Sequence, residues 1–149
     1  MSERARGFSL VELMVILAVV GIVAAFAFPS FVTYWQGATL RAGSEELVTV
    51  LNNARQLAIT SNNTVCVTAT TTTIQYHVGA CGNATYIGPG TDNAGNIKLA
   101  SAVQITNDPQ VAFTYLGGAS TSGVYNVRNA VNNTVQTVTV TASGRITIP

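Results

Sequence analysis

The chain has 149 residues, which allows one domain beyond a membrane segment. Only 9% of the residues are charged, far below the roughly 25% found in soluble proteins. A surface so poor in charge is covered instead by Thr, Asn, Ser and Gly, as is typical of extracellular proteins. The formal net charge of +1 argues against strong sequence-independent binding to nucleic acid, because that binding depends on many phosphate contacts.

The N-terminus combines a short basic leader, which ends at Gly7, with an apolar run over residues 8–28. As a helix this run would be roughly 30 Å long, enough to cross the hydrocarbon core of a bilayer. Two arginines precede the run, and no basic residue follows until Arg41. The sequence therefore predicts a transmembrane helix, with the leader in the cytoplasm and the rest of the chain across the membrane.

Glu12 is the single carboxylate inside the apolar run. An ionised acid at membrane depth costs about 2.5–3.5 kcal/mol on insertion scales, so it normally has a partner or a function. Glu12 either lies near the helix end and reaches the headgroups, or it pairs with a positive charge. Cleavage after Gly7 would create such a charge, because the new amine of Phe8 on one subunit could neutralise Glu12 on the next.

The helical pattern continues beyond Pro29, where apolar or small residues recur at spacings of three and four. They form one stripe, made of Leu40, Gly43, Leu47, Val50, Leu51, Ala54, Leu57 and Ala58. Arg41 and Glu45 lie on the opposite side as a pair of opposite charges four residues apart. We expect one helix over residues 8–60, amphipathic in its second half, with a kink at Pro29 and an end at Ser61-Asn62-Asn63.

From residue 64 onward the period of the apolar residues changes to two, which indicates strands. The expected strands are residues 65–67, 74–78, 97–105, 111–116, 124–128, 134–141 and 145–148. Residues 79–96, rich in Gly, Asn and Pro, are expected to form a loop. A long helix followed by consecutive short strands predicts an α+β fold, in which the apolar stripe covers one face of an antiparallel sheet.

The two cysteines, Cys66 and Cys81, both lie beyond the membrane segment. In an exported domain a disulfide is the expected state, and two thiols with one histidine make a poor metal site. In the chain-entropy model, closing a loop of this size contributes roughly 3 kcal/mol to stability.

No catalytic motif is present in the sequence, which lacks a Gly-x-Ser-x-Gly elbow, a histidine pair at metal spacing and a glycine-rich phosphate loop. The single histidine, His77, is expected on the solvent face of its strand together with Gln75. Asp92 and Asp108 stand in loop contexts, where turn formation explains them. A Ca²⁺ site at Asp92 would have only one carboxylate, which is a poor ligand set. We therefore expect no enzyme, no cofactor and no metal site.

The residues Gly7-Phe8-Ser9-Leu10-Val11-Glu12 resemble the type IV prepilin signal. In that family a dedicated peptidase cleaves after the glycine and N-methylates the new terminal phenylalanine, and a glutamate at the position of Glu12 serves assembly. Pro29 stands where these proteins carry a proline in their long first helix. The resemblance implies a pilin-like fold with three parts: a cleaved leader (1–7), a transmembrane and assembly helix (8–30), and a periplasmic domain (31–149) made of helix 31–60 and a β-rich part (64–149).

Later segments resemble the GspH/FimT branch of minor pilins and pseudopilins. They are Ala54-Arg55, Ala58, Val65-Cys66-Val67 and Ala142-Ser143-Gly144-Arg145-Ile146. Some FimT-type pilins that bind DNA end in Gly-Arg-x-Arg, whereas the matching segment here lacks the second arginine. Lys98, Arg128 and Arg145 are the basic residues that follow the helix. They leave DNA binding open as an alternative.

The resemblance implies a minor pilin that primes or caps the assembly of a type IV pilus, with a role in twitching, adhesion or DNA uptake. Its expected partners are other major and minor pilins, the prepilin peptidase and the bacterial inner membrane. A minor pseudopilin of a type II secretion system would share the same N-terminal chemistry and stays open. Two further alternatives are a secreted binding domain, cut after a small-x-small site at residues 25–27, and a single-span protein that is never cleaved.

Overall fold

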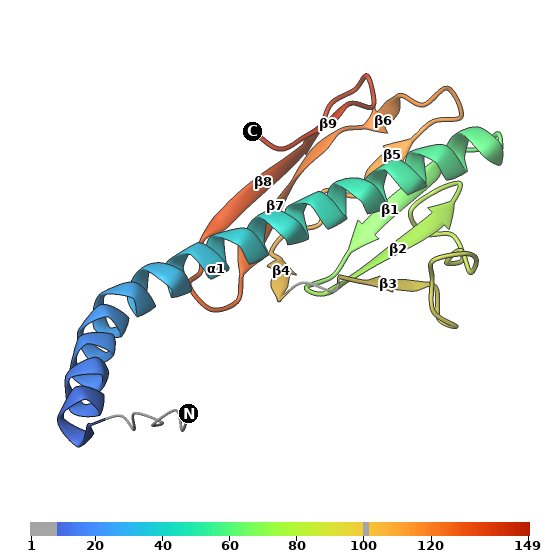
Figure 1. Cartoon of the computed structure of the whole chain (residues 1–149). Coiled ribbons are helices and arrows are strands. Elements are labelled where there is room, and N and C mark those ends of the chain that lie inside the picture. The colour runs from blue at the N-terminus through green and yellow to red at the C-terminus, as the bar shows by residue number, and fades with distance from the viewer. Residues whose placement is uncertain (1–8, 100–101) are drawn as a thin grey trace, which may run out of the picture. The chain divides into compact units, whose positions relative to one another are not determined.

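The computed structural model of the protein describes residues 9–99 and 102–149 (Figure 1). The chain divides into two compact units, Met1–Trp35 and Gln36–Pro149. Helix α1 (Leu10–Thr60) runs through the first unit and begins the second. All strands of the described chain belong to the second unit, which is called the globular unit below.

Helix α1 ends where the sequence predicts. Asn62 adopts a left-handed backbone with φ 50°, and the Asn63 amide donates to the Ala58 carbonyl at 3.2 Å. The Asn62 amide donates to the Ile59 carbonyl at 3.3 Å. These two bonds form a Schellman motif, which satisfies the last carbonyls of the helix. Asparagine tolerates the left-handed conformation better than most residues, so this end is encoded locally.

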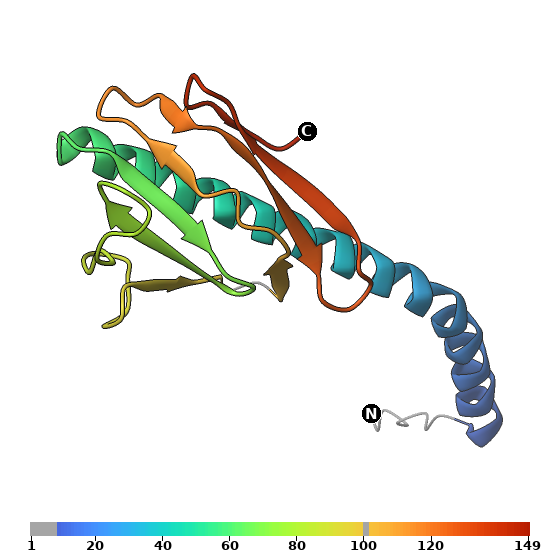
Figure 2. The same cartoon turned by 180° about the vertical axis from the view of Figure 1, so that it is seen from behind.

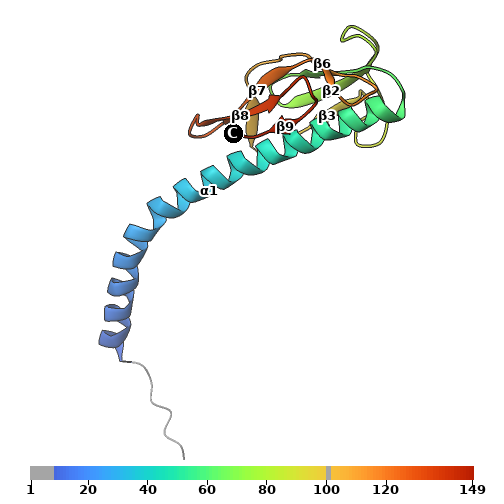
Figure 3. The same ribbon diagram turned by 90° about the horizontal axis from the view of Figure 1, so that it is seen from above.

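Nine strands follow in the described chain: β1 (Val65–Ala69), β2 (Thr73–Val78), β3 (Asn96–Lys98), β4 (Val103–Ile105), β5 (Val111–Phe113), β6 (Ala119–Thr121), β7 (Gly123–Asn129), β8 (Val135–Val140) and β9 (Ile146–Thr147). They form a five-stranded sheet of order β3-β2-β1-β5-β6 and a four-stranded sheet of order β4-β7-β8-β9. Neighbouring strands are antiparallel throughout both sheets. Figures 2 and 3 show that the sheets cover one side of the second half of α1. The expected α+β architecture is therefore confirmed, with two sheets in place of one.

The expected single strand over residues 97–105 is wrong. The structure has two strands there, and they join different sheets: Ile97 pairs with Ile74 of β2, whereas Val103 pairs with Asn129 of β7. Alternation of apolar and polar residues reports which face of a sheet a side chain occupies, but not which strand lies beside it. The chain therefore passes from the five-stranded sheet to the four-stranded sheet between residues 98 and 103, although the alternation of apolar residues continues through this segment.

Strand β6 is absent from the sequence-based expectation, and β5 is shorter than expected. β6 consists of the small residues Ala119-Ser120-Thr121, and it pairs with β5 across an irregularity at Ala112 and Phe113. Small polar residues carry little strand signal of their own. Pairing with β5 provides the backbone hydrogen bonds that hold this segment as a strand.

One hydrophobic core joins α1 to both sheets. Leu47, Leu51, Ala54 and Ala58 of the stripe are completely buried. They belong to the same cluster as apolar side chains of both sheets, which include Val67, Ile74, Phe113, Tyr125, Val127 and Val140. The stripe predicted from the spacing of apolar residues is therefore the face that packs on the sheets. On the opposite side, Arg41 Nε lies 2.9 Å from Glu45 Oε1 in the expected exposed ion pair.

A buried amide also joins α1 to the four-stranded sheet. Asn129, 2% exposed, donates from Nδ2 to the Gln36 carbonyl at 3.0 Å, while its Oδ1 accepts from the Val131 amide at 2.8 Å. Asn132 Nδ2 donates to Gln36 Oε1 at 3.0 Å. The turn between β7 and β8 thus holds the first residue of the globular unit.

Close packing requires a glycine at position 43, although glycine inside a helix is destabilising by helix propensity alone. A Cβ at Gly43 would lie 2.5 Å from Cγ2 of Val103 on β4. We expect Gly43→Ala to lower the free energy of unfolding by about 1 kcal/mol, because overpacking costs about 1–3 kcal/mol against a gain of roughly 1 kcal/mol in helix propensity. Urea unfolding of the full-length chain in detergent, followed by circular dichroism, measures this.

Gly37 is the matched control for Gly43. It lies in the same helix, and a Cβ there meets no atom within 4 Å. Gly37→Ala should therefore raise the free energy of unfolding by roughly 1 kcal/mol through helix propensity alone. Equal stabilisation by both substitutions would contradict the packing argument.

Two core tyrosines should make the domain sensitive to alkali. Burial raises the pKa of Tyr76 above its ordinary value, and burial does the same for the pKa of Tyr125. Above pH ~10 the unfolded chain loses these protons while the folded chain keeps them. The two tyrosines should therefore leave the free energy of unfolding unchanged below pH ~10. Above that pH the free energy of unfolding should fall, by up to about 1.4 kcal/mol per pH unit for each tyrosine.

Tyr76→Phe tests this prediction, because it removes one of the two titrating groups. The Tyr76 hydroxyl donates to the Val50 carbonyl at 2.7 Å, so the variant should lose about 1 kcal/mol at neutral pH. Above pH ~10 the free energy of unfolding of the variant should fall with pH about half as steeply as that of the wild type. Urea unfolding at a series of pH values measures both slopes. An unchanged slope would show that Tyr76 ionises normally in the folded protein.

Candidate functional site

The first unit presents an apolar helix that the described residues of the chain leave exposed. Its large apolar side chains between Leu10 and Phe28 are between 44% (Ile16) and 78% (Phe26) exposed. The most apolar 18-residue window of α1 has a mean hydropathy of 2.7, and none of it is buried. A soluble protein rarely leaves so large a continuous apolar surface in water. This segment therefore has the length and composition to cross a membrane or to be covered by other subunits.

Glu12 lies in the first turn of α1, with its side chain exposed. Within the described residues it has no ion-pair partner, so any neutralising charge must come from outside this part of the chain. Gly7 and Phe8, the predicted processing site, lie outside the described residues. Their roles, and that of Glu12 in assembly, stay predictions.

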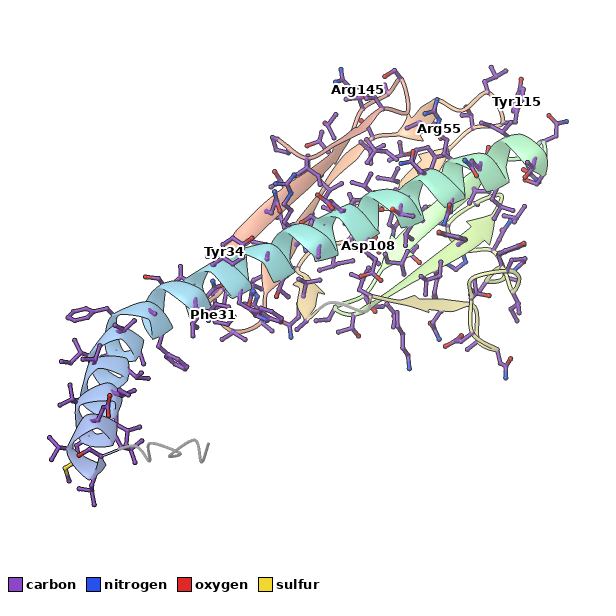
Figure 4. All side chains as sticks on the ribbon, viewed as in Figure 1. Phe31, Tyr34, Arg55, Asp108, Tyr115 and Arg145 are labelled. Atoms are coloured by element: carbon purple, nitrogen blue, oxygen red, sulfur yellow. A yellow bond between two sulfur atoms is a disulfide. The ribbon has the colours of Figure 1, made fainter. Side chains whose placement is uncertain are left out.

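The helical backbone of α1 continues through Pro29, and a kink at Pro29 stays a prediction. Phe31, Tyr34 and Trp35 follow it and are 60%, 75% and 64% exposed. Figure 4 shows Phe31 and Tyr34 projecting from the helix, and the rings of Phe31 and Trp35 lie 6.1 Å apart. Exposed aromatic side chains next to an apolar helix suit the headgroup region of a membrane.

The disulfide between Cys66 and Cys81 is present, as expected. The Cα atoms of these residues lie 5.0 Å apart, and Cys66 is completely buried on β1. Cys81 lies in the long segment between β2 and β3, residues 79–95, which is called the β2–β3 loop below. The disulfide therefore ties the start of this loop to the middle of the five-stranded sheet.

The expected solvent position of His77 is wrong, because its side chain is only 7% exposed. Its Nδ1 donates to the Asn83 carbonyl at 2.8 Å, and Thr68 Oγ1 lies 3.0 Å from Nε2. His77 does lie on the face opposite to Tyr76, as alternation predicts, but the β2–β3 loop covers that face. The histidine is thus a structural residue that holds the loop.

The three candidate DNA-binding residues do not share one element or one sheet. Lys98 lies on β3, the edge of the five-stranded sheet, and Arg145 precedes β9, the edge of the four-stranded sheet (Figures 1 and 4). Arg128 on β7 donates from Nη2 to Gln104 Oε1 on β4 at 2.7 Å, so its guanidinium serves a cross-strand contact. The three residues thus lie on or next to different strands, and these belong to both sheets, and DNA binding stays a prediction.

Gly144, which precedes Arg145, has a structural role of its own. Its φ is +78°, a conformation that favours glycine, and a Cβ there would collide with the Gly117 carbonyl oxygen. Close by, the Ala119 amide donates to the Ala142 carbonyl at 2.9 Å. The Gly-Arg motif therefore lies where the turn between β8 and β9 meets the turn between β5 and β6, and packing explains its glycine.

The two loop aspartates form turns, as expected. Asp92 Oδ1 accepts from the amides of Asn96 at 2.8 Å and Ala94 at 2.9 Å. The backbone and side-chain hydrogen bonds from Asn96 hold the pKa of the Asp92 carboxyl below its ordinary value. Asp108 Oδ1 accepts from the Gln110 amide at 3.1 Å. Within the described residues no group of three or more potential ligands is placed to hold a metal ion.

Comparison with known proteins adds to these observations. Residues 3–28 match the prokaryotic N-terminal methylation motif. The chain is 33% identical over 106 residues to a fimbrial protein of Pseudomonas aeruginosa, covering 66% of this chain and 68% of that protein.

Two solved structures share the fold. The type IV minor pilin FimU of Pseudomonas aeruginosa is 19% identical with a TM-score of 0.53, over 74% of this chain and 87% of FimU. The minor pseudopilin EpsH of the Vibrio cholerae type 2 secretion system is 13% identical with a TM-score of 0.52, over 71% of this chain and 92% of EpsH. At such identities the likeness concerns the fold alone.

Proposed function

The chain belongs to the family of type IV minor pilins and pseudopilins with an N-terminal methylation motif, and from this we propose that it primes or caps the assembly of a type IV pilus. Members of this family are structural subunits, not enzymes. The single observation that favours the pilus is the 33% identity to a fimbrial protein. Roles in twitching, adhesion or DNA uptake belong to this proposal.

In the proposed pathway the chain enters the inner membrane through the apolar part of α1, with its N-terminus in the cytoplasm. The prepilin peptidase removes residues 1–7 and methylates Phe8. The subunit then joins major and minor pilins, and the exposed apolar helix is covered by theirs. Its uncovered apolar surface supports this role, because leaving such a surface in water costs roughly 25 cal/mol per Å². The surface must therefore lie in the membrane before assembly and against other subunits after it.

The first test is the intact mass and N-terminal residue of the protein purified from its native membrane. A chain that begins at N-methylated Phe8 supports the proposed pathway. A start at Phe28 would indicate an exported soluble domain, and an intact Met1 would indicate an uncleaved membrane protein. Either of these results would overturn the proposal.

A minor pseudopilin of a type II secretion system is the second candidate, because EpsH resembles the fold as closely as FimU does. Deletion of the gene separates the two. Loss of surface pili and twitching with normal secretion supports the pilus. Loss of exoprotein secretion with normal pili supports the secretion system. Re-expression of the wild-type chain should restore whichever function is lost.

A further inference from the structure

A groove lies between the last turns of α1 and the β2–β3 loop. Its volume is about 400 Å³, within the range of small-molecule sites. Its lining includes Asn53, Gln56, Leu57 and Thr60 from α1, and Tyr86 and Pro89 from the loop. All of these residues belong to the globular unit.

The loop wall of the groove is anchored at several points, although it contains no regular strand or helix. The disulfide and His77 fix its first part. Tyr86 then donates its amide to the Tyr76 carbonyl at 2.7 Å, and the Asp92 carboxylate holds the last part through Asn96. Irregular loops of this length are uncommon and are usually functional or disordered. Here the many anchors indicate a preformed binding surface.

Two polar side chains on the helix side of the groove, Asn53 and Gln56, are free to bind. Asn53 and Gln56 lie three residues apart on one face of α1, and both are exposed. Within residues 9–99 and 102–149 neither side-chain amide has a hydrogen-bond partner. Each amide offers both donors and an acceptor. Opposite them the groove offers the half-buried Tyr86 ring and the apolar surfaces of Leu57 and Pro89.

No charged side chain lines the groove among the described residues. This lining disfavours phosphates, carboxylates and ammonium groups, which need a counter-charge when they leave water. It suits a neutral ligand that has many hydroxyls and one apolar face. We propose that this groove binds a neutral sugar, a hexose or an N-acetylhexosamine, with Asn53 and Gln56 on its hydroxyls and Tyr86 against its apolar face. The proposal goes beyond filament assembly and does not depend on it.

Saturation-transfer NMR on the full-length chain tests the proposal. The detergent must contain no sugar, so dodecylphosphocholine is suitable. The probes are glucose, galactose, mannose and N-acetylglucosamine, with glucuronate as the charged counterpart. We expect transfer to at least one neutral sugar and none to glucuronate. No transfer to any of the four neutral sugars, or equal transfer to glucuronate, would overturn the proposal.

Variants then locate the site. Asn53→Ala combined with Gln56→Ala should weaken binding of the responding sugar about tenfold or more, because two hydrogen bonds are lost. Asn52→Ala is the matched control, since Asn52 is an exposed neighbour on α1 that does not line the groove, and it should bind normally. Equal affinities for the double variant and the wild type would place the sugar elsewhere.

The other candidate occupant is a segment of a neighbouring subunit. Gln56→Cys, treated with a short thiol-to-amine cross-linker in assembled filaments, reports on it. A subunit-to-subunit adduct at this position would show that the groove is an assembly interface, and the sugar proposal would fail. A free, accessible thiol in the filament supports a groove that is open to ligands.

Discussion

Glu12→Gln should be processed and inserted normally but incorporated into filaments about 100-fold less than the wild type. In the variant the Phe8 amine of a neighbour would enter the apolar assembly without a counter-charge, and an unpaired charge at membrane depth costs about 2.5–3.5 kcal/mol. At about 1.4 kcal/mol per factor of ten, losing the pair costs roughly two orders of magnitude in association. The measurement is quantitative immunoblotting of sheared filaments against the membrane fraction.

Glu45→Gln is the matched control for Glu12→Gln. Glu45 is an exposed carboxylate on the same helix, paired with Arg41, and an exposed pair of this kind is worth at most about 1 kcal/mol. This control should assemble like the wild type. Mass spectrometry must show N-methylated Phe8 in both variants, so that a processing defect is separated from an assembly defect. Normal incorporation of the Glu12 variant would refute the charge-pairing hypothesis.

Removal of the disulfide should have the largest effect on stability. Cys66 and Cys81 are 15 residues apart in sequence, and a loop of that size is worth about 3 kcal/mol in the chain-entropy model. Cys66→Ala combined with Cys81→Ala should therefore lower the free energy of unfolding by about 3 kcal/mol. The expected site of weakening is the β2–β3 loop, because the disulfide is one of its main anchors. Urea unfolding and limited proteolysis of the full-length chain measure both effects.

Reduction of the wild-type protein is the control for the two substitutions. Dithiothreitol should destabilise the wild type by a similar amount and should leave the double variant unchanged, since the disulfide is its only target. Proteolysis should begin within residues 79–95 in both the reduced protein and the variant. A loss below about 0.5 kcal/mol, typical of a neutral surface substitution, would show that the other anchors hold the loop without the disulfide.

The disulfide and the groove are linked through the same loop. The wall that carries Tyr86 and Pro89 depends on anchors at Cys81, His77 and Asp92. Loss of the disulfide should therefore affect ligand binding through the position of the wall and not through direct contact. Removal of the side-chain amides of Asn53 and Gln56 should instead weaken ligand binding directly, because it leaves the loop intact.

Some features could be predicted from the sequence because they depend on near neighbours in the chain. The apolar run that begins at Phe8 and the stripe from Leu40 to Ala58 are periodic signals, and hydrophobicity alone determines which side of a helix is covered. The helix end at Asn62 follows from the left-handed tolerance of asparagine. The disulfide follows from the presence of two cysteines in an exported domain.

Other features required the tertiary structure because they depend on which distant residues meet. The alternating run from Ile97 to Ile105 could not reveal that its two ends join different sheets. His77 alternates as a surface residue does, yet the loop tied down by Cys81 covers it. Gly43 lowers helix propensity locally and becomes necessary only when Val103 approaches.

The sequence by itself thus determined the apolar helix, the N-terminal methylation motif and the α+β class, since each depends on local composition, spacing and period. The tertiary structure alone decided the division into two sheets, the burial of His77 and the groove beside Asn53 and Gln56. Those features arise from contacts between segments that are far apart in the chain, and local propensity carries no information about such contacts.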